Sequence, residues 1–136
     1  MTKIDFYQTC DEEITFACRL IGQVYRLGHQ IYVHAKDAEQ AVAVDEHLWI
    51  VPQDTFIPHA LQKSGGDAPI KIGYNHEPLD HQDVLVNLSG IVPHFFSRFE
   101  RVAEVVPAEE DRRQAARNNY SFYKERGYAM KYHQMN

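Results

Sequence analysis

The chain has 136 residues and a formal net charge of −5, with 24% charged and 44% hydrophobic residues. This length predicts one globular domain, residues 1–136, with a core of its own. The net negative charge disfavours direct, tight nucleic-acid binding, because proteins that bind the phosphate backbone usually carry a surplus of basic residues. No apolar run approaches the roughly 20 residues that span a membrane. The N-terminal stretch MTKIDFYQTC also lacks the apolar core of a signal peptide, so we expect a cytoplasmic protein with no membrane partner.

Strands and helices alternate along the chain. Runs rich in β-formers predict strands, and apolar residues at helical spacing predict helices. Two helix starts are marked by capping signatures, Thr9 to Glu12 and Asp37 to Gln40. The predicted elements are strands at 4–8, 30–34, 69–74, 84–88 and 101–106, and helices at 9–28, 37–49, 93–99 and 106–126.

This order of elements is β-α-β-α-β-β-α-β-α, without repeats or an internal linker. Such alternation predicts an α/β fold with a mostly parallel sheet and helices on both faces. A sheet of this kind often holds a nucleotide, but neither GxGxxG nor GxxxxGK[ST] occurs in the sequence. Asp11, Glu12 and Glu13, where the first helix begins, would repel a pyrophosphate. We therefore expect neither a dinucleotide nor a P-loop cofactor.

Residues 50–68, IVPQDTFIPHALQKSGGDA, have no sustained period and contain two prolines and a Gly-Gly pair. The segment is nevertheless too apolar for a merely solvated loop. One interpretation is a loop folded over its own core, as small satellite clusters under long loops often are. The other is a partner surface anchored by Trp49 and Phe56, because aromatic residues are the usual anchors of interfaces.

The last predicted helix, 106–126, carries a basic stripe. At 100° per residue, Arg113, Arg117, Tyr120 and Lys124 share one narrow line. Such charges can simply complement the helix dipole. On an acidic protein, a basic stripe with one aromatic also fits a receptor for an anionic ligand with an apolar end. Other features of this helix are Pro107 in the first turn, Gly127 just after the end, and a buried arc formed by Ala115, Ala116, Phe122 and Tyr123.

An enzymatic alternative rests on two features. Cys10 lies at a strand-to-helix turn, whereas Cys18 falls on the apolar face of the first helix and should be core. The loop His76–His81 contains ligand-type side chains, but their spacing matches no metal motif. No GxSxG nucleophile elbow occurs. The alternative is a small α/β enzyme with a site at the strand ends, and a further rival is direct single-strand binding by the aromatics near the basic stripe.

Several stretches together resemble the chi subunit family of the bacterial DNA polymerase III holoenzyme. They follow the order of the family and cover nearly the whole chain. The combination of D-E-x-L-W with F-x-P-H, and of V-P with Q-x-A-R-x-x-Y-x-x-Y, is the most specific part. The matching stretches are IDFYQ, DEHLWIVPQDTFIPHAL (45–61), GGDAPIKI (65–72), DVLVNLSG (83–90) and EVVPAEEDRRQAARNNYSFYKERGY (104–128).

The resemblance implies a Rossmann-like, non-enzymatic adaptor of the DNA replication machinery that contacts nucleic acid only indirectly. Members pair with the psi subunit, which ties them to the clamp loader. They also bind the acidic, Pro-Phe-ending C-terminal tail of the single-stranded-DNA-binding protein. Some also contact a helicase through the psi-facing surface.

Carried over by matching motif, the resemblance implies two sets of residues. A lysine is expected after Tyr120 in the tail site, but Ser121 stands there, so the charge would come from Lys124 or Arg113. The psi-facing surface would be formed by Trp49 and Phe56, with Pro58 and His59 nearby. The tail site would be formed by Val106, Arg117 and Tyr120, with Ser121, Arg113 and Lys124 on or beside the same stripe.

Overall fold

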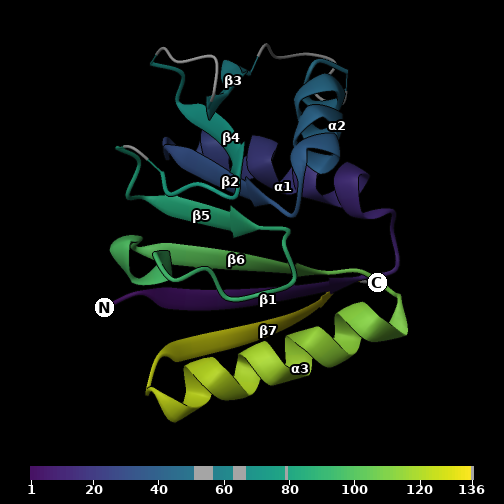
Figure 1. Ribbon diagram of the computed structural model, residues 1–136, viewed down its shortest axis with the longest axis vertical. Helices are drawn as coiled ribbons and strands as arrows, with labels where there is room; N and C mark the ends of the chain where they lie inside the picture. Colours follow the sequence, from purple (N-terminus) through teal and green to yellow (C-terminus); the bar gives the residue numbers. More distant parts are fainter. Residues whose placement is uncertain (51–56, 63–66, 79, 136) are drawn as a thin grey trace.

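The computed structural model describes residues 1–50, 57–62, 67–78 and 80–135. Within these residues the chain forms one seven-stranded sheet in the order β3-β4-β2-β5-β6-β1-β7, and every neighbouring pair is parallel (Figure 1). The strands are β1 (Lys3–Thr9), β2 (Ile31–Ala35), β3 (His59–Leu61), β4 (Ile70–Tyr74), β5 (Val84–Asn87), β6 (Arg101–Val106) and β7 (Ala129–Met135).

Helices cover the sheet from both sides. α1 (Glu13–Arg26) and α2 (Ala38–Leu48) pack together on one face, and α3 (Glu110–Glu125) lies along β7 on the other (Figure 1). This confirms the predicted Rossmann-like α/β class. No helix in the described part of the chain combines the length and the apolar character needed to cross a bilayer.

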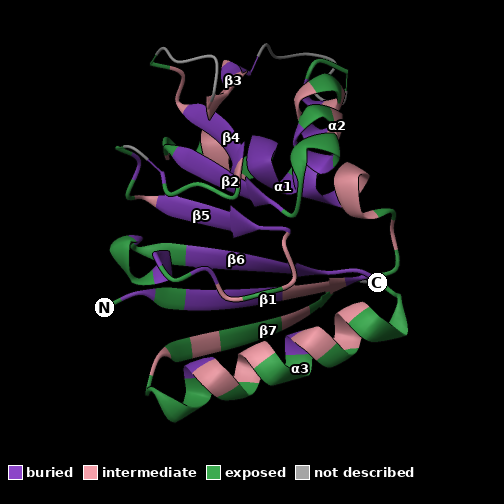
Figure 2. Ribbon diagram, in the orientation of Figure 1, coloured by how far each residue is buried: buried purple, intermediate pink, exposed green. Residues whose placement is uncertain are grey.

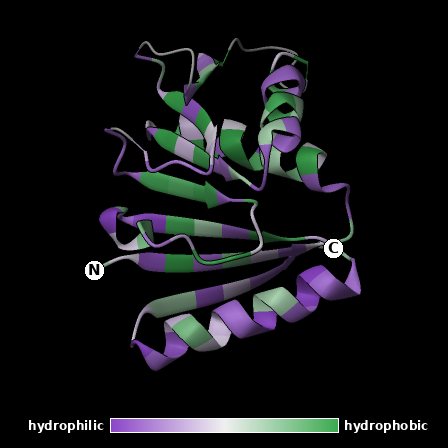
Figure 3. Cartoon of the chain, in the orientation of Figure 1, coloured by the Kyte–Doolittle hydropathy of each residue, from purple (hydrophilic) through white to green (hydrophobic). Residues whose placement is uncertain are grey.

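The sheet separates two apolar cores. The α1 side buries residues such as Ile21 and Val33, and the α3 side buries Phe6, Phe96 and Tyr123. Figure 2 shows the central strands buried along most of their length, whereas β7 at the edge is only partly covered. Burial on both faces explains the nearly continuous apolar run of β5. In Figure 3, β5 is correspondingly hydrophobic and α3 is hydrophilic along most of its length.

The two predicted capping signatures had different outcomes. At α2, the Asp37 carboxylate accepts a hydrogen bond from the Gln40 N–H at 2.8 Å, which confirms that signature. At α1 the prediction was wrong: the N-cap is Glu12, whose carboxylate accepts from the N–H groups of the second and third residues after it. Thr9 cannot cap the helix because it is still extended in β1, in register with Met135.

The start predicted for the last helix was also wrong. Val106 is the final residue of β6, paired in register with Gln8, so the parallel ladder holds it extended. The helix begins only at Glu110, so Pro107 lies in the connection and not in the first turn. The end was correct: Gly127 has a φ of +78°, and its N–H donates to the carbonyl of Lys124 at 3.0 Å.

Two edge strands were not predicted. β3 lies inside the segment 50–68 that was interpreted as a loop, and β7 follows the last predicted helix. Both are weakly patterned in sequence, and each is extended because it pairs with a neighbour, β4 or β1. The helix predicted at 93–99 is a single 3-10 turn, Phe96–Arg98.

Candidate protein-binding surfaces

The five cationic side chains of α3 and its C-cap divide into two groups. Arg112 points toward α1, where its Nη1 donates to Glu13 Oε1 at 2.9 Å and its Nη2 lies 2.8 Å from Oε2. Arg126 places its guanidinium 3.7 Å from the centroid of the Phe122 ring. These two cations are engaged within the fold. The remaining three, Arg113, Arg117 and Lys124, form the predicted stripe.

The partners of the stripe are weak. Arg117 pairs with Glu110 at 2.9 Å, but the two side chains are 57% and 80% exposed. Arg113 Nε donates to the Pro107 carbonyl at 3.4 Å, and Lys124 is exposed and makes no ion pair with another described residue. An exposed pair contributes only about 0.2–1 kcal/mol. A carboxylate arriving from solvent can therefore replace Glu110 at little cost.

An aromatic surface adjoins the stripe. The ring of Tyr120 is half-buried, and its centroid lies 5.6 Å from that of Phe6 and 6.4 Å from that of Tyr132. Tyr132 is 48% exposed, and its hydroxyl donates to Gln8. It comes from β7, so the sequence analysis missed it. The signal that could have found it is the alternation of AMKYHQM, in which Met130 and Tyr132 face α3.

One residue expected in the tail site, Val106, lies differently. Val106 is only 2% exposed and belongs to the core beneath α3, so it supports the surface without forming it. Four pockets of the described residues lie elsewhere, and Tyr120 lines none of these four. Ser121 is exposed on α3, as a contact residue must be.

A buried polar network fixes α3 to the sheet. Glu104 of β6 is 3% exposed, and Asn87 Nδ2 lies 3.0 Å from each of its oxygens. The Tyr123 hydroxyl donates to Glu104 Oε2 at 2.7 Å. Burial raises the pKa of Glu104 to about 7 and also raises that of Tyr123. Tyr123 and Ala116 are buried as predicted, whereas the other two residues of the predicted arc are only partly covered.

The second candidate surface surrounds Trp49 at the end of α2. Trp49 is 58% exposed and the next residue, Ile50, is 67% exposed. The Trp49 ring lies 4.6 Å from the ring of His59. The His59 side chain is fully buried: its Nδ1 lies 2.7 Å from the Ile57 carbonyl and its Nε2 lies 3.0 Å from the Asp45 carbonyl. His59 therefore supports Trp49 from beneath, contrary to the expectation that it forms the surface.

Of the two interpretations of the segment 50–68, the described residues support the first, and the partner surface stays a prediction. Ile57 is 1% exposed and Leu61 packs against the same core, so this part folds over its own interior. Trp49 and Ile50 stay exposed, as the partner-surface interpretation requires. Pro58 is partly covered, and Phe56 lies outside the described residues.

The features of the enzymatic alternative are scattered. Cys10 is exposed after β1, and Cys18 is buried, which raises its pKa to about 12. His76 is exposed, whereas His81 is buried with Nε2 at 3.0 Å from the Ala68 carbonyl. Among residues 1–50, 57–62, 67–78 and 80–135, no three histidine, cysteine or acidic side chains form a group that could hold a metal ion.

The fold and these surfaces define a Rossmann-like α/β domain that begins its first helix with acidic residues and exposes aromatic and cationic side chains at two places. Residues 1–131 match the family described as DNA polymerase III chi subunit, HolC. The chain is 38% identical to DNA polymerase III subunit chi of Pseudomonas aeruginosa, over 99% of this chain and 98% of that protein. It is 31% identical to the subunit chi of Escherichia coli, over 82% and 78% of the two chains. The chain therefore belongs to the DNA polymerase III chi subunit family, whose members are non-catalytic accessory subunits of the holoenzyme.

Proposed function

We propose that this chain is an adaptor that binds the psi subunit at the Trp49 surface and the acidic tail of the single-stranded-DNA-binding protein at α3. The observation that carries the proposal is the weakly paired stripe of Arg113, Arg117 and Lys124 beside an aromatic surface, on a molecule of net charge −5. The two surfaces lie toward opposite edges of the sheet, near β3 and near β7 (Figure 1). Both partners can therefore be held at once.

The tail would bind through its last residue. Its terminal phenyl ring would cover Tyr120 and the exposed part of Tyr132, and Arg117 would take the α-carboxylate with its planar guanidinium. Arg113 and Lys124 would attract the preceding aspartates at longer range. Because exposed charge pairs contribute only about 0.2–1 kcal/mol each, the ring and the carboxylate should dominate, and salt should weaken the complex.

Isothermal titration calorimetry with a synthetic acidic peptide ending in Pro-Phe tests this site. Arg117→Ala and Tyr120→Ala should each weaken binding at least about tenfold, because each removes a central anchor. Arg126→Ala is the matched control, since it removes one positive charge at the end of the same helix but outside the stripe. Equal losses in Arg117→Ala and Arg126→Ala would mean that only overall charge matters, and unchanged affinity in both anchor variants would remove the site.

Two further measurements sharpen the assignment. Amidating the peptide C-terminus should cost as much as Arg117→Ala in the wild-type protein and nothing more in that variant, because both changes remove the same ion pair. Ser121→Lys, which restores the expected lysine at an exposed position of α3, should tighten binding a few-fold. Binding of a bare oligonucleotide at the same site, lost in the same variants, would instead favour the direct single-strand binder.

The psi-facing surface is tested by co-purification. Trp49→Ala should abolish pairing with psi and spare tail binding, since truncating an interface anchor typically costs about 2 kcal/mol or more. Ile91→Ala is the control, because Ile91 is 65% exposed but lies in the loop after β5. A helicase that uses the same surface should compete with psi. Full recovery of psi with Trp49→Ala would contradict the assignment.

A further inference from the structure

The outer edge of β7 is open in the described part of the chain. β7 is the last strand of the sheet, and among the described residues it pairs only with β1. A strand at the edge of a sheet presents a row of unpaired N–H and C=O groups, which is a template for one more strand. In β7 this row extends over seven residues, most of them exposed (Figure 2).

The basic stripe of α3 lies beside this open edge. On one flank of α3, Asn119 donates to the Gly90 carbonyl at 3.1 Å, so this flank faces the loop after β5. On the other flank, Tyr120 packs beside Tyr132 of β7. At about 100° per residue, the cations of the stripe lie within about 60° of Tyr120 around the helix axis and about 120–160° from Asn119. The stripe therefore faces outward past β7, at the end of the sheet (Figure 1).

The stripe and β7 match in length. From Arg113 to Lys124 the helix rises about 16 Å, at about 1.5 Å per residue. An extended strand covers this distance in about five residues, at about 3.3 Å each. β7 has seven residues, and α3 lies along it (Figure 1). A strand paired with β7 would therefore pass all three cations of the stripe.

The edge carries positive charge on both faces. Residues 126–135 contain no aspartate or glutamate. On the face opposite α3, Lys131 is exposed, and its acidic neighbour in register, Asp5, is held by His133 at 3.0 Å. On the α3 face, Glu110 pairs with the stripe but is 80% exposed. Because successive side chains of a strand alternate between faces, consecutive acidic residues would meet the stripe and Lys131 in turn.

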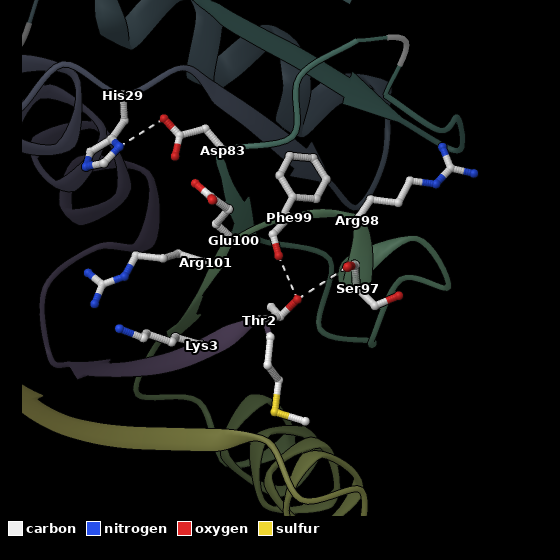
Figure 4. Close-up of a pocket in the computed structure, with 10 residues that line it drawn as sticks. Thr2, Lys3, His29, Asp83, Ser97, Arg98, Phe99, Glu100 and Arg101 are labelled. Atoms are coloured by element: carbon white, nitrogen blue, oxygen red, sulfur yellow. Dashed lines mark hydrogen bonds and ion pairs between the residues drawn. The ribbon is translucent and has the colours of Figure 1, made fainter.

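Other occupants and other sites fit the charge less well. A pocket of about 660 Å³ at the amino ends of β1 and β6 is lined by Asp83 and Glu100 as well as by Lys3 and Arg101, so it offers an acidic ligand less attraction (Figure 4). A second copy of this chain could pair its own β7 with the edge around a two-fold axis. The two α3 helices would then lie on the same face, and their basic stripes would repel each other.

We propose that the open edge of β7 binds the acidic stretch that precedes the last residue of the tail, as an added strand of the sheet. The inference rests on the proposed function and deepens it, because there these acidic residues are attracted only at long range. Here their backbone pairs with β7, and this pairing brings their side chains alternately to the stripe and to Lys131. In strand addition of this kind, main-chain hydrogen bonds contribute affinity and the side chains contribute specificity.

N-methylation of single peptide bonds tests the pairing without changing any side chain. Calorimetry compares the acidic peptide ending in Pro-Phe with versions that are methylated in turn at each of the four residues before the proline. Only alternate N–H groups of an added strand point toward β7. We therefore expect a loss of at least about fivefold at every second position and less than about twofold at the positions between. Equal losses, or none, at all four positions would overturn the strand addition and leave the tail site in place. No binding of the unmodified peptide would remove both proposals.

Amide hydrogen exchange measured by nuclear magnetic resonance tests the same pairing from the side of the protein. Saturating peptide should slow exchange at least about tenfold at alternate residues of 129–135, because their outward N–H groups become hydrogen-bonded. Lys131→Glu should weaken binding at least about threefold, since like charges then lie side by side. Lys36→Glu is the matched control, because Lys36 is exposed after β2, far from this edge in the strand order. Binding without protection of β7, or equal affinities of the two variants, would contradict the added strand.

Discussion

Replacing Glu104 by Gln tests the network that holds α3 on the sheet. In the folded protein, burial raises the pKa of Glu104 from 4.5 to about 7. Between these two values the folded state binds more protons than the unfolded state, so the stability contributed by this group is lost as the pH rises through about 7. A difference of about 2.5 pKa units corresponds to a loss on the order of 3 kcal/mol.

Glutamine stays neutral at every pH and therefore lacks this loss. It also sacrifices one acceptor facing Asn87 Nδ2, but that cost does not depend on pH. The variant-minus-wild-type difference in unfolding free energy should therefore rise by about 3 kcal/mol between pH 4.5 and 8.5. Burial lowers the pKa of His34 to about 4, and this group has the opposite slope, with stability lost as the pH falls from 6.5 toward 4. His34 is common to both proteins, so its contribution cancels in the difference.

Urea denaturation followed by far-ultraviolet circular dichroism at four or five pH values measures this difference. The variant Tyr123→Phe is the control for the hydrogen bond, because it removes the donor to Glu104 and leaves the buried carboxyl in place. It should destabilise the protein and enlarge the pH-dependent loss, because the hydrogen bond from Tyr123 lowers the pKa of Glu104 and its removal raises that pKa further. A difference between Glu104→Gln and wild type that stays constant within about 1 kcal/mol from pH 4.5 to 8.5 would refute the assignment of a raised pKa to Glu104.

Three other substitutions test the packing of the fold, each by chemical denaturation. Arg112→Ala should cost about 1–3 kcal/mol, because it leaves the half-buried Glu13 without its cation; no loss would show that the bridge between α1 and α3 is replaced by water. Ile57→Ala should cost about 2–5 kcal/mol, since Ile57 is 1% exposed in the core; a cost below 1 kcal/mol would argue against its burial. Gly73→Ala should be strongly destabilising, because a Cβ there meets the buried ring and hydroxyl of Tyr32. Adding Tyr32→Phe should restore part of the loss, and no restoration would contradict this contact.

The predicted elements are confirmed where the local sequence pattern and the tertiary environment favour the same structure. The run at β5 is apolar on both faces because the strand is buried on both, and the strand predicted at 101–106 matches β6. Asp37 caps α2 as expected. The wrong predictions fall at positions where pairing in the sheet overrides local signals. Thr9 and Val106 are followed by residues typical of helix starts, but both residues are extended because they pair with a neighbouring strand.

The candidate sites show the same division. Helical spacing predicted that Arg113, Arg117 and Lys124 share a stripe on α3, and the aromatic residues in and beside the apolar segment 50–68 suggested Trp49 as a separate anchor. Helical spacing could not show that Arg112, one position before Arg113, forms an ion pair with Glu13 of α1. It also could not show that Tyr132 lies beside Tyr120, because that contact depends on β7 pairing with β1 across more than a hundred residues of chain.

The sequence by itself determined the alternation of strands and helices, the lack of a phosphate-binding glycine motif and the amphipathic faces of the helices. These features depend on residue types and on spacings of a few positions. Only the tertiary structure decided the order of the strands, the two edge strands, and the burial of His59 and Val106. These features arise from contacts between segments distant in the chain, whose energies are not encoded in any local period.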